Sequence, residues 1–203
     1  MKRDTTTGRR AAFLDRDGVI NIDRGYVYRA EDFDFVPGVF QGARRLHELG
    51  YALVVVSNQS GIGRGFFSES QFHLLSDWMR QKFMDAGAPL SGVYFCPHHP
   101  TEARDQYRRR CDCRKPAPGM LLSAAHDLQL DLRASAMFGD KRSDLEAALA
   151  AHVPLRVLLG TDGRKPLKAD GEDGLATASF RRLDEALSER SLFSMTNAGS
   201  PHA

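Results

Sequence analysis

A repeated pattern constrains the fold of this chain more than any single residue does: short apolar segments stop abruptly at charged or polar side chains. Segment 11–14 ends at Asp15 and Asp17, and segment 52–56 ends at Ser57. Continuous apolar, β-branched segments of this length are typical of strands that are buried on both faces of a parallel sheet. Since helical segments separate them, the sequence predicts an α/β fold with a doubly wound parallel sheet.

Further strands and helices alternate along the chain. Three more strands are expected at 92–95, 136–138 and 155–159. Apolar residues recur with helical period after Pro37, and a capping-box sequence begins at Ser68. We expect helices over the segments 39–49, 69–86, 118–128, 145–149 and 183–187. Parallel strands would bring their carboxyl ends, and the polar residues that follow, to one edge of the sheet.

Two carboxylates one residue apart follow the first strand. Asp15 and Asp17 occupy alternate positions and would point the same way. Their repulsion is unfavourable unless a proton or a cation lies between them, and Mg²⁺ prefers oxygen ligands of this kind. The alternative is an ordinary turn with two solvated aspartates, since aspartate and glycine are both turn residues.

The loop after the second strand, 57–65, carries hydroxyl and amide groups in place of carboxylates. Donors at the carboxyl end of a strand suit a phosphate group. The glycines of this loop lack the spacing of a dinucleotide-binding motif, so on their own they indicate only a flexible loop. The polar loop 21–27 could likewise contact a polar ligand or serve as a plain connection.

All three cysteines lie in one short stretch, which argues against a secreted disulfide framework. Cys96, Cys111 and Cys113, together with a histidine, can form a Cys₃His set of the type that holds structural zinc. His98 is favoured over His99, because its spacing from Cys96 mirrors the spacing of the other two cysteines. Three free thiols beside a surface histidine are the alternative.

Two cations follow this zinc loop directly. Arg114 and Lys115 come after Cys113, so a metal bound by the loop would fix the position of both. The fourth expected strand leads to Asp140, which is the better metal ligand of the two aspartates in that region. Asp144 is interpreted as a cap of the next helix.

The length and charge of the chain limit its class. With 203 residues we expect a single domain over 11–190, between flexible polar ends at 1–10 and 191–203. The net charge of +2 does not suggest a nucleic-acid surface, and no apolar segment approaches the roughly 18 residues of a membrane span. Since the start lacks the layout of a signal peptide and no long exposed apolar stripe is evident, we expect a cytoplasmic monomer that acts on a small molecule.

Four of these features occur in the order and spacing of the motifs of one enzyme superfamily. Asp15-x-Asp17, Ser57, Lys115 and Gly139-Asp140-x-x-x-Asp144 together resemble the haloacid dehalogenase (HAD) superfamily of phosphotransferases. The resemblance is closer still to one branch, the D-glycero-D-manno-heptose 1,7-bisphosphate phosphatases. The segments that carry it extend over most of 11–160 and are Asp15-Arg-Asp-Gly, Gly25-Tyr-Val, Ser57-Asn-Gln-Ser-Gly-Ile, Cys96-Pro-His-His-Pro, Cys111-Asp-Cys-Arg-Lys-Pro and Phe138-Gly-Asp-Lys.

The resemblance implies a reaction and roles for four residues. The reaction is Mg²⁺-dependent removal of the C7 phosphate of the sugar through an aspartyl-phosphate intermediate, in the synthesis of ADP-heptose for the lipopolysaccharide core. Asp15 would be the nucleophile, and Asp17 would be the general acid and then the general base. Ser57 and Lys115 would bind the phosphoryl oxygens, where charge must be stabilised in the transition state.

Two metals are implied as well. Mg²⁺ would be held by the carboxylates of Asp15 and Asp140 and by the backbone carbonyl of Asp17, with Lys141 in electrostatic support. A structural zinc ion would hold the loop 96–113 in shape. Its implied ligands are Cys96, His98, Cys111 and Cys113.

The resemblance also implies contacts with the rest of the substrate. They would come from Asp23, Arg24, Gly25, Tyr26, Ser57, Asn58, Gln59, Ser60, Arg114 and Lys115. Arg114 would bind the distal phosphate, a task suited to a bidentate guanidinium, and the resemblance associates it with the β-anomer. The gaps between the motifs are too short for a folded cap domain, so a nearly capless enzyme is expected.

Two other functions are compatible with the same residues. Histidinol-phosphate phosphatases, a sister family, have similar catalytic motifs and a similar zinc loop. The Gly25-Tyr26-Val27 segment and the junction at Arg114 favour the heptose enzyme over them. A catalytically silent, zinc-stabilised module that binds a phosphorylated ligand is the alternative from another class. The presence of all the expected catalytic carboxylates argues against it.

Overall fold

A six-stranded parallel sheet forms the centre of the computed structural model, which describes residues 8–160, 174–189 and 192. Its order is β3-β2-β1-β4-β5-β6. The strands are β1 (Arg9–Leu14), β2 (Ala52–Asn58), β3 (Leu90–Cys96), β4 (Leu130–Gly139), β5 (Leu155–Leu159) and β6 (Ala178–Phe180). The chain winds outward from β1 to β3 and then, after β4, outward in the other direction. The predicted doubly wound parallel sheet is therefore confirmed.

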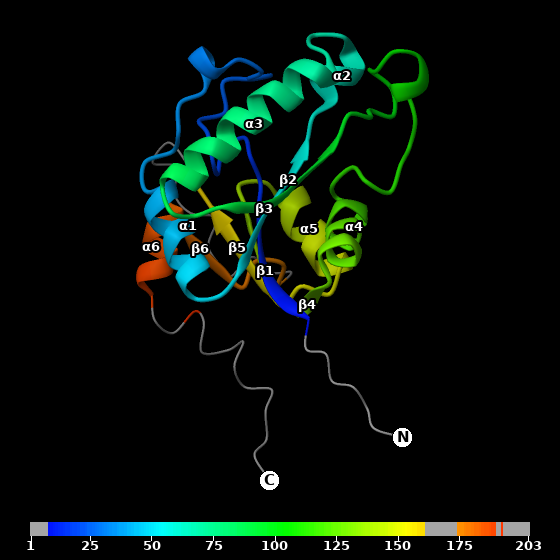
Figure 1. Cartoon of the computed structure of the whole chain (residues 1–203). Coiled ribbons are helices and arrows are strands. Elements are labelled where there is room, and N and C mark those ends of the chain that lie inside the picture. The colour runs from blue at the N-terminus through cyan, green and yellow to red at the C-terminus, as the bar shows by residue number, and fades with distance from the viewer. Residues whose placement is uncertain (1–7, 161–173, 190–191, 193–203) are drawn as a thin grey trace.

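Helices cover both faces of this sheet (Figure 1). On one face α1, α3 and α6 share a core with the strands, and on the other face α4 and α5 do so. The α-helices are α1 (Val39–Glu48), α2 (Ser60–Arg64), α3 (Glu69–Asp85), α4 (Gly119–Leu128), α5 (Arg142–Ala150) and α6 (Leu183–Ser188), and two short 3₁₀ helices are η1 (Ala30–Asp32) and η2 (Asp105–Tyr107).

The central strand shows why both faces need helices. In β1, Ala12 and Leu14 point into the core under α1, α3 and α6, whereas Ala11 and Phe13 point into the core under α4 and α5. All four side chains are fully buried. Alternate residues of a strand face opposite sides, so an uninterrupted apolar strand is stable only when both sides are covered.

Local signals in the sequence set several helix ends. At the start of α3 the Ser68 hydroxyl accepts a hydrogen bond from the Gln71 amide at 3.2 Å, and the Ser68 amide donates to Gln71 Oε1 at 2.9 Å. The predicted capping box is thus present. Helix α1 ends at Glu48, and Gly50 follows with a φ of 85°, a conformation that favours glycine.

Some elements differ from the sequence-based expectation. Strand β1 begins at Arg9 rather than 11, and β4 begins at Leu130 rather than 136. The first residues of these two strands pair with each other, Arg9 with Leu130 and Arg10 with Asp131, although both segments are partly polar. The short edge strand β6 was not predicted. The surface loop expected over 160–174 and the tail after 197 lie largely or wholly outside the described residues.

The carboxyl edge of the sheet gathers the polar residues of the motifs. Strand β1 leads into Asp15, β2 ends in Ser57 and Asn58, and β4 ends just before Asp140. Between β1 and α1 the chain forms a loop with η1, and between β3 and α4 it forms the loop with η2. In the described parts of the chain neither insertion builds a cap domain, and no helix there is long and apolar enough to cross a membrane.

Candidate active site

A buried lysine lies between two aspartates at the carboxyl edge of the sheet. Lys115 Nζ is 2.8 Å from Asp15 Oδ1 and 2.7 Å from Asp144 Oδ1, and it donates to the Val56 carbonyl at 2.7 Å. The lysine side chain is 1% exposed. Burial lowers the pKa of Lys115, but the two facing carboxylates raise it further, so the net shift is upward and the side chain remains a cation.

Asp140 completes a cluster of carboxylates. One oxygen each of Asp15, Asp140 and Asp144 lie within 4.8 Å of one another. Burial, followed by the negative charge of Asp15, raises the pKa of Asp140 to about 8. Oδ1 of Asp140 is buried without a hydrogen-bond partner among the described residues. Gly18, with a φ of 101°, leaves the space that the Asp140 carboxylate occupies, since a Cβ there would collide with it.

This cluster suits a hard divalent cation. The three carboxylates repel one another, and one of their oxygens, Oδ1 of Asp140, has no hydrogen-bond partner among the described residues. A cation that prefers oxygen ligands, such as Mg²⁺, would relieve that repulsion. Asp15 and Asp140 were expected in this role. Asp144 was interpreted as a helix cap, and its Oδ2 does accept from the Lys141 amide at 3.0 Å. Its other oxygen binds Lys115, a contact that the interpretation as a cap missed.

The carboxylate of Asp17 does not belong to this cluster and is held by three donor residues. Oδ1 accepts from Arg16 Nη2 at 2.7 Å and from Asn21 Nδ2 at 3.0 Å. Oδ2 accepts from Arg16 Nη2 at 2.8 Å and from Gln59 Nε2 at 2.9 Å. The same Gln59 nitrogen donates to the Ser57 hydroxyl at 2.8 Å, which leaves the hydroxyl proton of Ser57 free for another acceptor. Asp17 and Ser57 are thereby connected through one amide.

Asn58 uses both ends of its side-chain amide on one neighbour. Its Oδ1 accepts from the backbone N–H of Lys115 at 3.0 Å, and its Nδ2 donates to the Lys115 carbonyl at 3.0 Å. The residue was expected to contact substrate. The structure shows that it also joins the end of β2 to the segment that carries the buried lysine.

Two adjoining cavities open at this edge. The smaller, of about 50 Å³, is lined by Asp15, Asp17, Ser57, Asn58, Lys115, Lys141, Ser143 and Asp144. The larger, of about 320 Å³, is lined by Asp17, Asp23, Gly25, Tyr26, Asn58, Gln59, Ser60, Gly61 and Lys141. Since they share three residues, a molecule in the larger cavity could place a small group in the smaller one. The larger volume is in the usual range for small-molecule sites.

The loop after β1 forms one wall of the larger cavity. Asp23 Oδ1 accepts from the Gly25 amide at 3.0 Å, and Asp23 Oδ2 accepts from Lys141 Nζ at 3.1 Å. Although burial opposes it, these contacts hold the pKa of Asp23 below its usual value. Lys141 Nζ also lies 3.9 Å from Asp140 Oδ2, so it stands between the wall and the carboxylate cluster.

Two of the residues expected to contact substrate do not line either cavity. Arg24 lines neither cavity, and its side chain forms an exposed ion pair with Asp34 at 2.6 Å. Arg114 also lines neither cavity, and its Nη1 donates to the His98 carbonyl at 3.2 Å. Sequence reasoning therefore included an arginine, Arg24, that the described structure does not bring to the cavities, and did not recognise the buried Arg16 beside Asp17.

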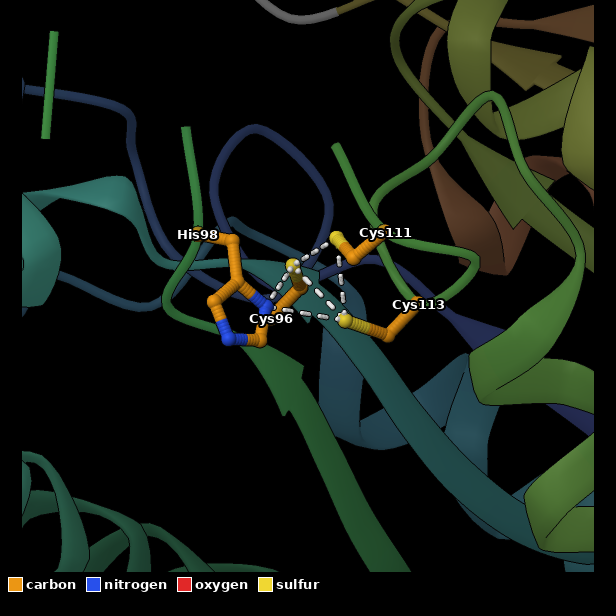
Figure 2. A group of neighbouring side chains, drawn as sticks. All are labelled: Cys96, His98, Cys111 and Cys113. Atoms are coloured by element: carbon orange, nitrogen blue, oxygen red, sulfur yellow. Dashed lines mark hydrogen bonds between the residues drawn. The ribbon is translucent and has the colours of Figure 1, made fainter. Parts of the chain in front are cut away.

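A second cluster contains the three cysteines and one histidine (Figure 2). Cys113 Sγ lies 3.1 Å from Cys96 Sγ, 3.3 Å from Cys111 Sγ and 3.2 Å from His98 Nδ1. The four ligand atoms lie within 4.8 Å of one another. The ring of His99, in contrast, accepts from the Glu102 amide at 3.0 Å.

The donor set of this second cluster fits zinc. Three sulfurs and one imidazole nitrogen that converge on one point are the ligands of a closed tetrahedral zinc site. Burial, together with the hydrogen bond from Cys113, raises the pKa of the Cys96 thiol. A thiol in this environment keeps its proton until a cation replaces it.

Comparisons with known proteins agree with this geometry. A family model described as HAD-hydrolase-like matches residues 112–178. D-glycero-beta-D-manno-heptose-1,7-bisphosphate 7-phosphatase of Photorhabdus laumondii is 50% identical over 167 residues, which are 82% of this chain and 88% of the relative. The protein of the same name from Escherichia coli strain K12 is 50% identical over 163 residues, 80% of this chain and 84% of the relative.

A solved structure extends the similarity to three dimensions. D,D-heptose 1,7-bisphosphate phosphatase from B. bronchiseptica, complexed with magnesium and phosphate, is 26% identical to this chain with a TM-score of 0.69. The match covers 88% of this chain and 96% of that chain. Magnesium and phosphate in that protein are the two species that the carboxylate cluster and the smaller cavity suit by their chemistry.

Proposed function

This chain belongs to the family of D-glycero-β-D-manno-heptose-1,7-bisphosphate 7-phosphatases, and we propose that it removes the C7 phosphate of that sugar with Mg²⁺ as cofactor. It is a phosphatase of the HAD type. The observation that carries the proposal is the placement of Asp15, bound to the buried Lys115, at a small cavity that adjoins one of sugar size.

The first step is attack by Asp15 on phosphorus. A carboxylate oxygen of Asp15 forms a bond to phosphorus while the bond from phosphorus to the C7 oxygen breaks. Asp17 gives its proton to that oxygen as it leaves. Lys115 keeps the Asp15 carboxylate in one orientation, and the hydroxyl of Ser57 can donate to a phosphoryl oxygen because its own oxygen already accepts from Gln59.

The second step regenerates the enzyme. Asp17, now a carboxylate, takes a proton from water, and the resulting hydroxide attacks phosphorus. The bond between phosphorus and the Asp15 oxygen breaks, so inorganic phosphate and the free carboxylate are released. Lys115 and Ser57 balance the charge that develops on the phosphoryl oxygens in both steps.

Mg²⁺ would be held by the carboxylates of Asp15 and Asp140 and the backbone carbonyl of Asp17, where it supplies positive charge against the repulsion between nucleophile and phosphate. Asp144 fixes Lys115 beside this site, and Lys141 supports Asp140. The zinc proposed for Cys96, His98, Cys111 and Cys113 has a structural role, because it holds the loop that leads to Lys115.

The substrate proposal rests on the larger cavity. Asp23, Gly25, Tyr26, Gln59 and Ser60 line it and offer carboxylate, amide and hydroxyl groups to a polyol. Arg114 is proposed to bind the distal phosphate of the β-anomer with N–H groups other than the one that donates to the His98 carbonyl. The product would then serve ADP-heptose synthesis for the lipopolysaccharide core.

The alternatives are less well supported. The relatives that share about half of their residues with this chain carry the name of the heptose enzyme, so histidinol phosphate is not the favoured substrate. A silent binding module does not agree with the assembled carboxylates and lysine. We further propose that the enzyme acts as a monomer in the cytoplasm, without a nucleic-acid or membrane partner.

The test compares substrates side by side. Phosphate release with Mg²⁺ is measured from both anomers of the heptose bisphosphate and from histidinol phosphate. A preference in kcat/KM of about 100-fold or more for the β-anomer over histidinol phosphate, roughly 2.7 kcal/mol, is the expected result. A preference for histidinol phosphate would contradict the substrate, and no turnover of any of the three would contradict the activity.

A further inference from the structure

Arg16, the residue between the two aspartates of the first motif, is the largest side chain of the described structure that is fully buried. It is 1% exposed. Burial of a guanidinium is unfavourable unless a partner compensates for the lost hydration. The only ion-pair partner of Arg16 in the described parts of the chain is Asp17. The positive charge of the buried guanidinium is therefore compensated by a single carboxylate, that of Asp17.

Among the described residues, all hydrogen bonds of this guanidinium come from one nitrogen. Nη2 donates to Asp17 Oδ1 at 2.7 Å, to Asp17 Oδ2 at 2.8 Å and to the Val27 carbonyl at 2.8 Å. Nε and Nη1 are buried without a hydrogen-bond partner among the described residues. An arginine that served only to fill the core would not need a charge there, since an apolar side chain of similar volume would avoid the two unpartnered donors.

Two aromatic rings hold the guanidinium in this place. Its carbon lies 5.9 Å from the centre of the Phe33 ring and 5.8 Å from the centre of the Phe72 ring. Both rings belong to buried residues. A cation between aromatic faces is stabilised more strongly when it is shielded from water. The position of Nη2, and with it that of Asp17, is thus determined by the core beneath the site.

We propose that Arg16 is a positioning residue for Asp17, which it holds in the orientation needed for proton transfer. Arg16 lines neither cavity, so it reaches the substrate only through Asp17. Its bond to Val27 also ties the carboxylate to the loop that carries Asp23, Gly25 and Tyr26 on the wall of the larger cavity. The same contact thereby fixes the position of the general acid relative to that wall.

The inference rests on the proposed role of Asp17 as general acid and base, and it makes a prediction about leaving groups. When the bond from phosphorus to a sugar or alkyl oxygen breaks, that oxygen needs a proton from Asp17. When p-nitrophenolate leaves, no proton is needed, because the anion is stable in water. A misplaced Asp17 should therefore slow the first step for an alkyl phosphate far more than for p-nitrophenyl phosphate.

The experiment measures single-turnover release of the leaving group from glycerol 3-phosphate and from p-nitrophenyl phosphate. The variants are Arg16→Met, which removes the cation, and Arg16→Lys, which keeps a cation but lacks the planar guanidinium that lies over the rings of Phe33 and Phe72. For both we expect a loss of about 10- to 100-fold with glycerol 3-phosphate, a part of the 10²- to 10⁴-fold that a general acid typically provides. With p-nitrophenyl phosphate the loss should stay below about threefold.

A matched control is available on β1, the strand that precedes Arg16. Arg10 also lies over an aromatic ring, at 4.4 Å from the centre of Tyr51, and it donates to the Leu49 carbonyl. It belongs to β1 at the end away from the cavities. Arg10→Met should leave the ratio of the two rates unchanged. A loss of stability from removing an arginine that lies over an aromatic ring would appear in both variants, whereas a change in the ratio of the two rates should appear only at Arg16.

A double-substitution cycle separates positioning from direct action. In the Asp17→Asn background, Arg16→Lys should slow glycerol 3-phosphate by less than about twofold, because the residue through which Arg16 acts is already inactive. An undiminished loss in that background, or equal losses for both substrates, would overturn the proposal. If Arg16→Met does not fold, Arg16→Lys carries the same comparison.

The same data distinguish this inference from the proposed function. Wild-type protein that hydrolyses both simple phosphates but not the heptose bisphosphate would contradict the proposed substrate. The ratio of the rates with glycerol 3-phosphate and p-nitrophenyl phosphate would still test the role of Arg16. Wild-type protein that hydrolyses none of the three would contradict the activity and the inference together.

Discussion

The two clusters of metal-ligand type in this protein are built in opposite ways. The carboxylate cluster, Asp15, Asp140 and Asp144, lies at the sheet edge and contains its own cation, Lys115, within 2.8 Å of two of its members. The thiol cluster, Cys96, His98, Cys111 and Cys113, lies at the start and end of a loop after β3. In the described structure its ligand atoms form side-chain hydrogen bonds only with one another.

This difference indicates what a metal would do in each place. In the carboxylate cluster a lysine already offsets part of the negative charge, so the fold can assemble the site and a metal mainly adds reactivity. The thiol cluster contains no such cation in the described structure, and burial raises the pKa of the Cys96 thiol, so metal binding would contribute directly to the stability of the loop. We therefore expect substitutions in the first cluster to affect catalysis and substitutions in the second to affect folding.

The largest effect should come from the nucleophile. Asp15→Asn is expected to lower kcat by at least ~10⁴-fold, roughly 5.5 kcal/mol, because an amide cannot form the phospho-intermediate. The fold should persist, since Lys115 keeps its pair with Asp144. Kinetics and thermal unfolding measure the two effects. Asp34→Asn, in the exposed pair with Arg24, is the control that should retain activity. Retained turnover in Asp15→Asn would refute the assignment.

Lys115 is an exception to this difference, because it lies in the carboxylate cluster and should nevertheless contribute to the stability of the fold. Lys115→Met would leave two buried carboxylates without their cation, at a cost of about 3–5 kcal/mol in the free energy of unfolding. Denaturant titration measures this. Lys141→Met removes an exposed lysine from the same site and should cost less than about 1 kcal/mol. Equal losses of stability in the two variants would contradict the expectation that burial makes Lys115 contribute more to the free energy of unfolding than Lys141 does.

Substitutions in the thiol cluster should have the next largest effect, a loss of bound zinc and of stability. Wild-type protein is expected to contain about one zinc per chain, and the Cys111→Ser, Cys113→Ser variant should contain almost none. At a free zinc concentration of about 100 Kd, the lost binding lowers the free energy of unfolding by about 2.7 kcal/mol. Elemental analysis and thermal unfolding test both statements, with His99→Ala as the variant that should keep its zinc. A stable, zinc-free wild-type protein would contradict the expectation.

The pH dependence of magnesium binding follows from Asp140. Its pKa is about 8 in the folded protein, against 3.8 for an ordinary aspartate, so between these values the folded protein holds a proton that the unfolded chain has lost. As pH rises from about 4 to about 8, this group therefore lowers the stability of the metal-free protein.

Magnesium must displace the same proton. Its affinity should rise about tenfold per pH unit below pH 8, which is about 1.4 kcal/mol per unit. Calorimetry at pH 6 and 7 measures the change. In Asp140→Asn the group cannot titrate, so any remaining affinity should lose this dependence. An affinity in wild type that is flat between pH 6 and 7 would mean that Asp140 is already ionised.

The smallest effect should come from Asn58, which joins the end of β2 to the segment that carries Lys115. Asn58→Ala removes both hydrogen bonds to the backbone of Lys115. We expect a loss of about 1 kcal/mol in the free energy of unfolding and a decrease of about fivefold in kcat, the equivalent of that energy. KM should change little if Asn58 acts mainly on Lys115. A rise in KM at unchanged kcat would instead identify Asn58 as a substrate contact.

The accuracy of the sequence-based predictions differed between kinds of element. The strand at 52–56 was predicted correctly because continuous β-branched, apolar segments of this length are typical of buried parallel strands. The beginnings of β1 and β4 were missed, since Arg9 and Arg10 are polar and enter the sheet only because Leu130 and Asp131 pair with them. The edge strand β6 was missed for a similar reason: it is short, and pairing with β5 holds it.

The site residues also differ in how well the sequence predicts them. Spacing along the chain brought out the carboxylates after β1 and the thiols of the loop, because those chemical groups are unusual at such positions. It could not show that Asp144 reaches Lys115, that Arg24 turns to Asp34, or that Arg16 is buried under Asp17. These contacts depend on side-chain directions that a motif does not contain.

The class of fold and the chemistry at the sheet edge follow from the amino-acid sequence, since periodicity and the ends of apolar segments are local properties of the chain. Which charges pair depends on the tertiary structure. Lys115 lies 100 residues from Asp15, and the two meet because parallel strands and the loop after β3 converge at one edge. Burial at that edge then fixes the pairing, because a charge removed from water requires a partner nearby.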